Sequence, residues 1–223
     1  MKETPTIKER LKLIEPHPIQ IAKESKALVE TMRFEPLGGI ANLEEHLARL
    51  ENSTQTLGFT YNRHAVRNML HMACFPLIKP HFIRLVINYN GRIAVEIAPP
   101  ENAPEKIIEC FPVQRSCPAN DERLYHALLP RVANDISGKN TDIWLAIDPS
   151  GHVTETALGN IFIQDNDRLL TPPRSLGLLP GLLRERLLSS GNAKESLLSL
   201  QDLKSGFLIG HDLFGLVKAK LLR

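Results

Sequence analysis

The sequence has little charge imbalance and few cysteines. Its 27 Lys and Arg residues against 25 Asp and Glu residues leave a net charge of +2, which gives no reason to expect nucleic acid as a partner. No apolar run reaches membrane length, and the start "MKETPTIKERLKL" is charged from its second residue, so we expect neither a membrane span nor a signal peptide. Three cysteines, an odd number, argue against a disulfide framework and favour a reducing cytoplasm.

Sequence motifs that bind metals or nucleotides are also missing. The eight histidines are dispersed and form no HExxH or similar pair, so we expect no metal site. No GxGxxG or GxxxxGKS loop occurs, so nucleotide binding through either loop is not supported. The stretch "GLLPGLLR" contains glycines but lacks the Lys-Ser/Thr ending of a phosphate-binding loop.

The pattern that remains predicts a mixture of helices and strands. With 43% hydrophobic and 23% charged residues, the 223-residue chain is typical of a globular protein. The clearest helix is "ANLEEHLARLENSTQTLGF", with Asn42 as its cap, Glu45 three residues on and one stripe of leucines. Asn90-Gly91 predicts a hairpin with a type I′ turn. The other predicted elements are strands at 28–34 and 107–113, helices at 63–70, 124–135 and 181–190, hairpins at 142–158 and 160–173, and a C-terminal strand, turn and short helix.

Two lobes are the predicted organisation. The polar stretch "QRSCPANDER" follows the strand-rich first half and precedes a second series of helices and strands. We therefore predict an α/β (α+β) fold with an N-terminal lobe at residues 1–114, a linker at 115–122 and a C-terminal lobe at 123–223.

Glu155 lies in "GHVTETALGNIF" among residues that are typical of a buried strand. Val153, Ile161 and Phe162 are core residue types, and a buried carboxylate is costly unless a cation or a hydrogen-bond donor contacts it. Taken alone, Glu155 could also be an ordinary strand glutamate whose side chain faces either solvent or a buried arginine.

Several stretches occur in a fixed order from about residue 28 to the C-terminus: "ETMRF", "HLARLENSTQTLGF", "GHVTETALGNIF", "LLTPP", "GLLPGLLRERLL" and "FLIGHDLFGL". This set resembles the class IV, fold-type IV pyridoxal-phosphate enzymes and is most similar to aminodeoxychorismate lyases. The resemblance implies a two-lobed fold, pyridoxal phosphate as cofactor, and a homodimer whose partner helps to close the site. It also implies a small amino or anionic metabolite as substrate; the lyase reaction releases pyruvate and gives 4-aminobenzoate for folate synthesis.

The resemblance implies four cofactor-binding residues. Glu155 stands where the family glutamate pairs with the pyridine nitrogen, which keeps that nitrogen protonated and makes the ring a better electron sink. Arg49 in "HLARL" matches the arginine that contacts the cofactor phosphate. Leu182 and Leu183 would offer backbone amides at a helix start, although many relatives have a threonine at the second position. The alternatives are a solvated helix-face charge for Arg49 and a plain helix start for the two leucines.

The lysine that forms the Schiff base in this family has no counterpart in the sequence. No lysine occurs between Lys106 and Lys139. Depending on which neighbour is aligned, the lysine position falls on one of four residues that cannot form an aldimine: Pro118, Ala119, Asp121 or Glu122. A second departure is His211-Asp212, which stands where the family has an Asn-Ser/Thr pair near the phosphate. An aspartate beside a phosphate is repulsive unless it is protonated or paired.

Three interpretations follow, and the sequence leaves all of them open. The chain could be a lyase or aminotransferase whose lysine comes from elsewhere, with Lys79, Lys106 and Lys139 as candidates. It could instead be a catalytically inactive relative that binds a ligand or assembles with a partner. In the third interpretation the pocket uses another chemistry, with Cys117 as nucleophile or Asp121 and Glu122 as acid–base groups beside His126; an inert thiol is the simpler alternative.

Overall fold

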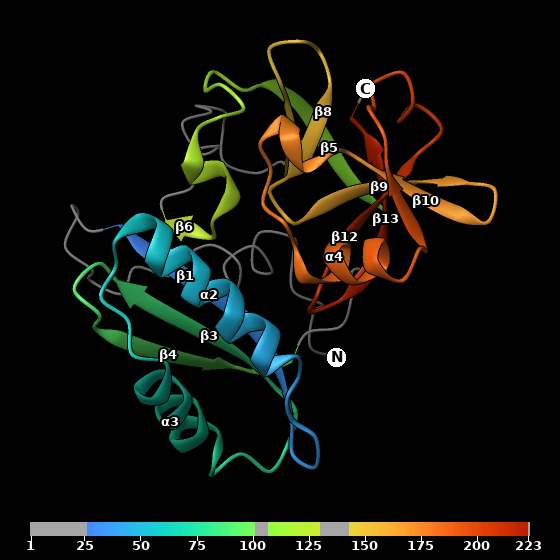
Figure 1. Cartoon of the computed structure of the whole chain (residues 1–223). Helices are drawn as coiled ribbons and strands as arrows, with labels where there is room; N and C mark the ends of the chain where they lie inside the picture. Colours follow the sequence, from blue (N-terminus) through green and yellow to red (C-terminus); the bar gives the residue numbers. More distant parts are fainter. Residues whose placement is uncertain (1–25, 101–106, 130–142, 223) are drawn as a thin grey trace. The chain divides into compact units, whose positions relative to one another are not determined.

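The computed structural model describes residues 26–100, 107–129 and 143–222. The chain divides into two compact units (Figure 1). Unit 1 comprises Met1–Glu101 and Ala127–Pro130, and unit 2 comprises Asn102–His126 and Arg131–Arg223. Each unit has its own sheet, and the mixed α+β fold class agrees with the prediction. Among the described residues, no helix is both long enough and apolar enough to cross a membrane.

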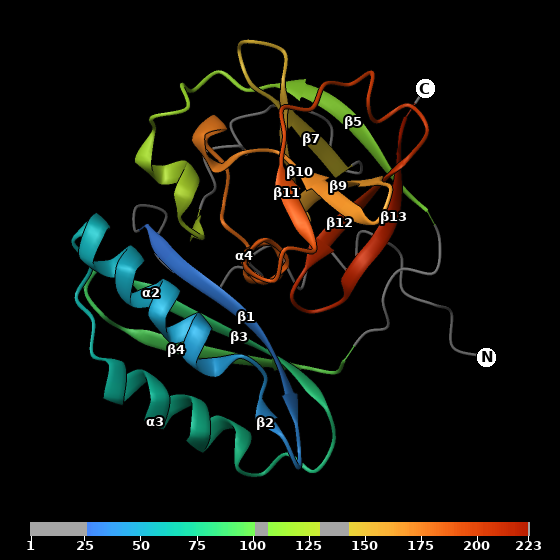
Figure 2. The same cartoon turned by 45° about the vertical axis from the view of Figure 1, so that its right-hand side comes forward.

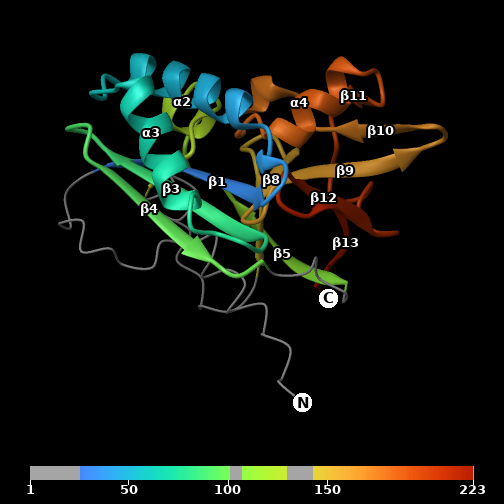
Figure 3. The same ribbon diagram turned by 90° about the horizontal axis from the view of Figure 1, so that it is seen from below.

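Unit 1 is an antiparallel sheet with two helices on one face (Figure 3). The strand order is β2-β1-β3-β4. The short strands β2 and β6 pair with opposite ends of the same edge of β1. The core between sheet and helices contains Leu47 and Leu50 of the predicted leucine stripe, both buried. The bounds are β1 Ala27–Glu35, β2 Gly39–Ile40, α2 Leu43–Leu57, α3 Arg63–Cys74, β3 His81–Asn88, β4 Ile93–Ala98 and β6 Leu128–Leu129.

Two local predictions in unit 1 need correction. Asn42 is the N-cap residue of α2, as predicted, but it adopts the left-handed region with φ of 53°, and its side chain makes no capping hydrogen bond to the helix. The hairpin between β3 and β4 has a four-residue loop rather than a type I′ turn. Gly91 alone in that loop has a positive φ, 79°, and its N–H donates to the Asn88 carbonyl. A type I′ turn requires positive φ at both central residues, and Asn90 does not adopt it.

Unit 2 is a larger sheet that curves round on itself (Figure 2). The strand order is β11-β10-β9-β12-β13-β5-β7-β8, and β8 also pairs with β9, which closes the strands from β9 to β8 into a barrel. Helix α4 packs against the sheet through Leu187 and Leu188, which contact the core around Phe162. The bounds are β5 Ile108–Gln114, β7 Ile143–Ile147, β8 Val153–Thr156, β9 Asn160–Asp165, β10 Arg168–Thr171, α4 Leu182–Ser189, β11 Ala193–Glu195, β12 Phe207–His211 and β13 Gly215–Leu221, with short 3₁₀ turns η1 Glu122–Tyr125 and η3 Arg174–Leu176.

The structure corrects two predicted helices. The C-terminal segment forms strand β13, in which buried Val217 and Ala219 alternate with exposed Leu216, Lys218 and Lys220, a period of two. The described part of the predicted helix at 124–135 forms η1 and β6 instead. Leu128 lies in a strand because it pairs with Leu28 and its side chain packs in the core of unit 1.

The division between the units also differs from the predicted lobes. Strand β5 belongs to unit 2, because it pairs with β7 and β13 of the barrel and with no strand of unit 1. Residues 115–122 lie in unit 2 as well, and the chain returns to unit 1 only at Ala127–Pro130. The polar stretch at 115–122 therefore does not link two lobes, because its backbone is part of the barrel unit.

Candidate functional site

Unit 2 contains a backbone segment, Leu176–Gly181, that is held by three buried polar side chains. The segment begins at the last residue of η3 and leads directly into α4. Arg115, Glu155 and Asn160 all form hydrogen bonds to its backbone. Hereafter the 176–181 clamp means this segment and these three side chains.

Glu155 faces the backbone of this segment. The four residues of β8 are all buried, and Glu155 is only 3% exposed. Its Oε2 accepts a hydrogen bond from the Leu179 N–H at 3.1 Å. A buried carboxylate is tolerated where donors of this kind contact it. The alternative in which Glu155 faces solvent is therefore wrong.

Asn160 holds both ends of the turn before α4. Its Nδ2 donates to the Leu179 carbonyl at 2.8 Å, and its Oδ1 accepts from the Gly181 N–H at 3.1 Å. A Cβ atom on Gly181 would lie 2.3 Å from Asn160 Oδ1, so only glycine leaves room for this contact. A Cβ atom on Gly159 would likewise lie 2.3 Å from the Gly210 carbonyl oxygen in β12. The glycines of "ALGN" and "LPG" therefore have a packing role.

Arg115 reaches the same segment from the end of β5. The residue is 3% exposed, and its Nη2 donates to the Leu176 carbonyl at 2.7 Å while Nη1 donates to the Gly177 carbonyl. Its Nε donates to the Cys117 carbonyl at 3.1 Å. Sequence reasoning missed Arg115, because an arginine that follows a strand carries no signal of burial.

Leu182 and Leu183 form the first turn of α4, directly after the clamp. The cap residue is Gly181, which supplies no side-chain capping bond. The first amides of an α-helix have no acceptor within the helix, and such amides suit an anion. The structure thus brings three of the four sequence-predicted residues, Glu155, Leu182 and Leu183, to one segment of unit 2.

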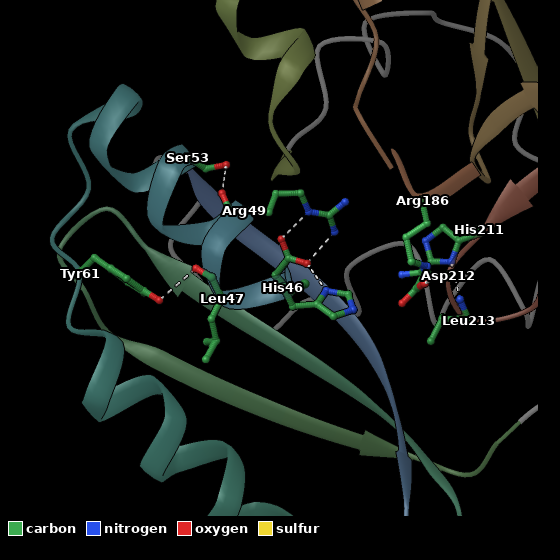
Figure 4. Close-up of polar contacts among 10 residues, drawn as sticks. His46, Leu47, Arg49, Ser53, Tyr61, Arg186, His211, Asp212 and Leu213 are labelled. Carbon is green, nitrogen blue, oxygen red and sulfur yellow. Dashed lines mark hydrogen bonds and ion pairs between the residues drawn. The ribbon is translucent and has the colours of Figure 1, made fainter. Parts of the chain in front are cut away.

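Arg49, the fourth predicted residue, lies in α2 of unit 1 and is paired with a carboxylate (Figure 4). Its Nε and Nη2 donate to the two carboxylate oxygens of Glu30 at 2.9 and 2.6 Å. His46 Nδ1 lies 2.6 Å from the same carboxylate, and both Glu30 and His46 are buried. Arg49 is therefore part of a buried polar cluster, and the alternative of a solvated helix-face charge is wrong.

The Glu30 carboxylate is ionised in this cluster. Burial alone would raise its pKa, but the charge of Arg49 and the hydrogen bonds with His46 and Arg49 outweigh burial and lower the pKa to about 2. No motif in the sequence marks His46. For Glu30 a signal is present, since "LVETMRF" places a carboxylate in an apolar strand in the same way as the stretch around Glu155.

The His211-Asp212 pair lies where β12 ends, and both side chains have polar partners within unit 2 (Figure 4). Asp212 forms an ion pair with Arg186 of α4. His211 Nδ1 accepts a hydrogen bond from the Leu213 N–H at 3.1 Å, and its ring stacks on Phe214 with the centroids 5.2 Å apart. A protein cation therefore pairs with the carboxylate that the sequence left unexplained.

The lysines in the described part of the chain lie on the surface. Lys79, one of three candidate replacements for the Schiff-base lysine, is exposed. The other two candidates, Lys106 and Lys139, lie outside the described residues. The remaining described lysines are exposed as well: Lys26, Lys194, Lys204, Lys218 and Lys220.

The loop after β5 offers little support for an alternative nucleophile. Burial raises the pKa of the Cys117 thiol, whereas reactive cysteines have a lowered pKa. The hydrogen bond from Arg123 lowers the pKa of Asp121, which keeps this carboxylate ionised. His126 is buried and lies 3.3 Å from Glu122. In the parts of the chain that the structure describes, no group of acidic, histidine and cysteine side chains could hold a metal ion.

Comparison with known proteins identifies the family. The model of the family "Amino-transferase class IV" matches residues 27–219. A candidate amino-acid aminotransferase from Mesorhizobium loti is 29% identical with a TM-score of 0.81, over 88% of this chain and 100% of that chain. A candidate 4-amino-4-deoxychorismate lyase from Legionella pneumophila is 18% identical with a TM-score of 0.74, over 99% and 88%. The Escherichia coli branched-chain amino acid aminotransferase is 18% identical with a TM-score of 0.68, over 89% and 77%. The curated proteins give no match. The chain therefore belongs to the class IV aminotransferase family.

Proposed function

We propose that this chain binds a small anionic ligand without a covalent bond and has lost Schiff-base chemistry. Class IV aminotransferases generally use pyridoxal phosphate. The described residues do not fit a covalently attached cofactor, because no lysine occurs between Lys106 and Lys139 and the described lysines are exposed. A Schiff base needs a lysine inside the site, so this absence is the observation that carries the proposal.

The proposed ligand contacts are Glu155, Leu182 and Leu183 of unit 2, whereas Arg49 of unit 1 is paired with Glu30. A carboxylate suits a protonated ring nitrogen or an amine, and helix-start amides suit a phosphate or carboxylate. This combination supports pyridoxal phosphate itself or an amino metabolite with an anionic group as ligand. We further propose a cytoplasmic homodimer, in line with the free cysteines Cys74, Cys110 and Cys117.

A second candidate function is aminodeoxychorismate lyase activity. The likeness of the fold to the Legionella pneumophila candidate lyase favours it, and so does the order of the motifs along the chain. This candidate needs a lysine from a segment outside the described residues, Lys106 or Lys139, or from a partner chain. It predicts one specific covalent adduct with pyridoxal phosphate.

The first experiment is the intact mass after equimolar pyridoxal phosphate and borohydride reduction, followed by peptide mapping. We expect low labelling spread over surface lysines, with the urea-unfolded chain as the control for intrinsic lysine reactivity. One pyridoxyl group on a single lysine would overturn the proposal and support the lyase candidate. Noncovalent binding is tested by calorimetry with pyridoxamine 5′-phosphate, which has no aldehyde. Saturable binding by the wild type and weaker binding by Glu155→Gln would support the ligand role, and absence of binding would contradict it.

A further inference from the structure

Arg115 is a buried cation whose hydrogen-bond acceptors are backbone carbonyls. Its three donor contacts go to Cys117, Leu176 and Gly177, and among the described residues no carboxylate forms an ion pair with it. Hydrogen bonds to a charged donor are stronger than neutral ones, and a guanidinium has a rigid fork that fixes the direction of each. Two adjacent carbonyls can meet this fork only if the backbone at Leu176–Gly177 keeps one conformation.

The other side chains of the 176–181 clamp hold the rest of the segment. Glu155 accepts from the Leu179 N–H, and Asn160 binds the Leu179 carbonyl and the Gly181 N–H. Arg115 therefore fixes the beginning of the segment, while Glu155 and Asn160 fix its end, where α4 starts. The three side chains come from β8, from the start of β9 and from the residue after β5. All three bind the backbone of the six residues 176–181.

Close packing keeps this segment against the loop after β5. Gly177 has a φ of +76°, and a Cβ atom there would lie 2.7 Å from Leu124 Cδ1 and 2.9 Å from the Ala119 carbonyl oxygen. Arg174, just before the segment, lies over the Tyr125 ring at 5.5 Å from its centroid. The loop that contains the aligned lysine positions is thus packed directly against the segment that leads into α4.

We propose that Arg115 is a positioning residue for the ligand site of unit 2. By holding Leu176–Gly177, it orients the segment so that Glu155 and the first turn of α4 are presented to the same ligand. The inference rests on the proposed function for the ligand, and on the hydrogen bonds of the clamp for the geometry. It assigns Arg115 a role through the backbone, without contact to the ligand itself.

The test compares Arg115→Lys with Arg174→Lys. Both change an arginine to lysine beside the same segment, but Arg174 is exposed and does not bind the carbonyls of Leu176 and Gly177. We expect amide hydrogen exchange within 176–181 to be about tenfold faster in Arg115→Lys, with β9 and β12 unchanged, because lysine cannot bind both carbonyls in a fork. We expect pyridoxamine 5′-phosphate to bind on the order of tenfold more weakly to this variant at a temperature where it is fully folded. Arg174→Lys should match the wild type in both measurements.

The outcomes separate this inference from the proposed function. If the wild type does not bind pyridoxamine 5′-phosphate, the proposed function is contradicted. The amide exchange rates still test whether Arg115 holds the 176–181 segment. Unchanged exchange or unchanged affinity in folded Arg115→Lys would overturn the positioning role. If that variant does not fold, amide exchange in the wild type tests the clamp instead. The amides of Leu179 and Gly181 should then exchange as slowly as those of β9. Exchange as fast as at Asn166 and Asp167, in the exposed turn between β9 and β10, would mean that the clamp does not form.

Discussion

Each unit buries a carboxylate within a strand, Glu30 in β1 of unit 1 and Glu155 in β8 of unit 2, but the two carboxylates have different surroundings. Glu30 of unit 1 is surrounded by side chains, with Arg49 and His46 within 2.9 Å of its oxygens. Glu155 of unit 2 binds a backbone amide, and the neighbouring side chains of the clamp also bind backbone atoms. The first cluster balances charge, whereas the second fixes the path of the chain.

The difference bears on what each cluster can tolerate. Removal of one member of a buried ion pair leaves an uncompensated charge, which is more costly than the loss of a neutral hydrogen bond. Unit 1 should therefore respond to substitutions mainly in its stability and its pH dependence. Unit 2 should respond mainly in the local order of residues 176–181 and in the ligand binding that depends on them.

The largest expected effect is that of Glu30→Ala. This change leaves Arg49 without its buried partner and should lower the free energy of unfolding by about 3–5 kcal/mol. Urea denaturation of variant and wild type gives the value. The control is Glu109→Gln, which removes an exposed ion pair with Lys220 and should cost less than about 1 kcal/mol. Equal losses in the two variants would remove the distinction between a buried and a surface pair.

The pH dependence of stability should be the next largest effect. The pKa of Glu30 falls from 4.5 to about 2 on folding, so its contribution is complete above pH 4.5 and is lost as the pH falls from 4.5 towards 2. A shift of this size corresponds to about 3 kcal/mol. The stability difference between wild type and Glu30→Gln, measured by urea denaturation at several pH values, should therefore shrink through this window. A difference that is independent of pH would show that Glu30 is not the group that titrates.

A smaller effect is expected for Asn160→Ala in unit 2. The change leaves the Leu179 carbonyl and the Gly181 N–H without their side-chain partner, which should cost about 1–3 kcal/mol. The loss should show in urea denaturation, with faster amide exchange confined to 176–181. Asn192→Ala is the control, because Asn192 is exposed and its side chain binds only the nearby Ser190 hydroxyl. If Asn160→Ala behaved like this control, the clamp would have no energetic role.

Local patterns predicted most of the elements. The leucine stripe of α2 and the short apolar runs of β3, β7 and β9 are properties of the sequence alone, and each indicated its element. The prediction failed where another part of the chain decides the conformation. Leu128 is in a strand because Leu28 pairs with it, and Gly91 lies in a longer loop than its Asn-Gly pair indicated.

The candidate site was predictable in part. The family resemblance supplied Glu155, Leu182 and Leu183, and the structure places all three at the segment that leads into α4. Arg115 and Asn160 could not be assigned in this way, because the atoms that they bind in the 176–181 segment are backbone atoms more than 18 residues away along the chain. Backbone partners carry no side-chain signature, so a sequence pattern cannot indicate them.

Residue identity and spacing suffice to assign the family and the mixed fold class, and they show that no lysine occurs between Lys106 and Lys139. Tertiary structure alone decided that Arg49 is neutralised by Glu30 and that Arg115 is buried against the carbonyls of Leu176 and Gly177. The physical reason is that the energy of a charge depends on which donors, acceptors and counter-charges folding brings within about 3 Å of it.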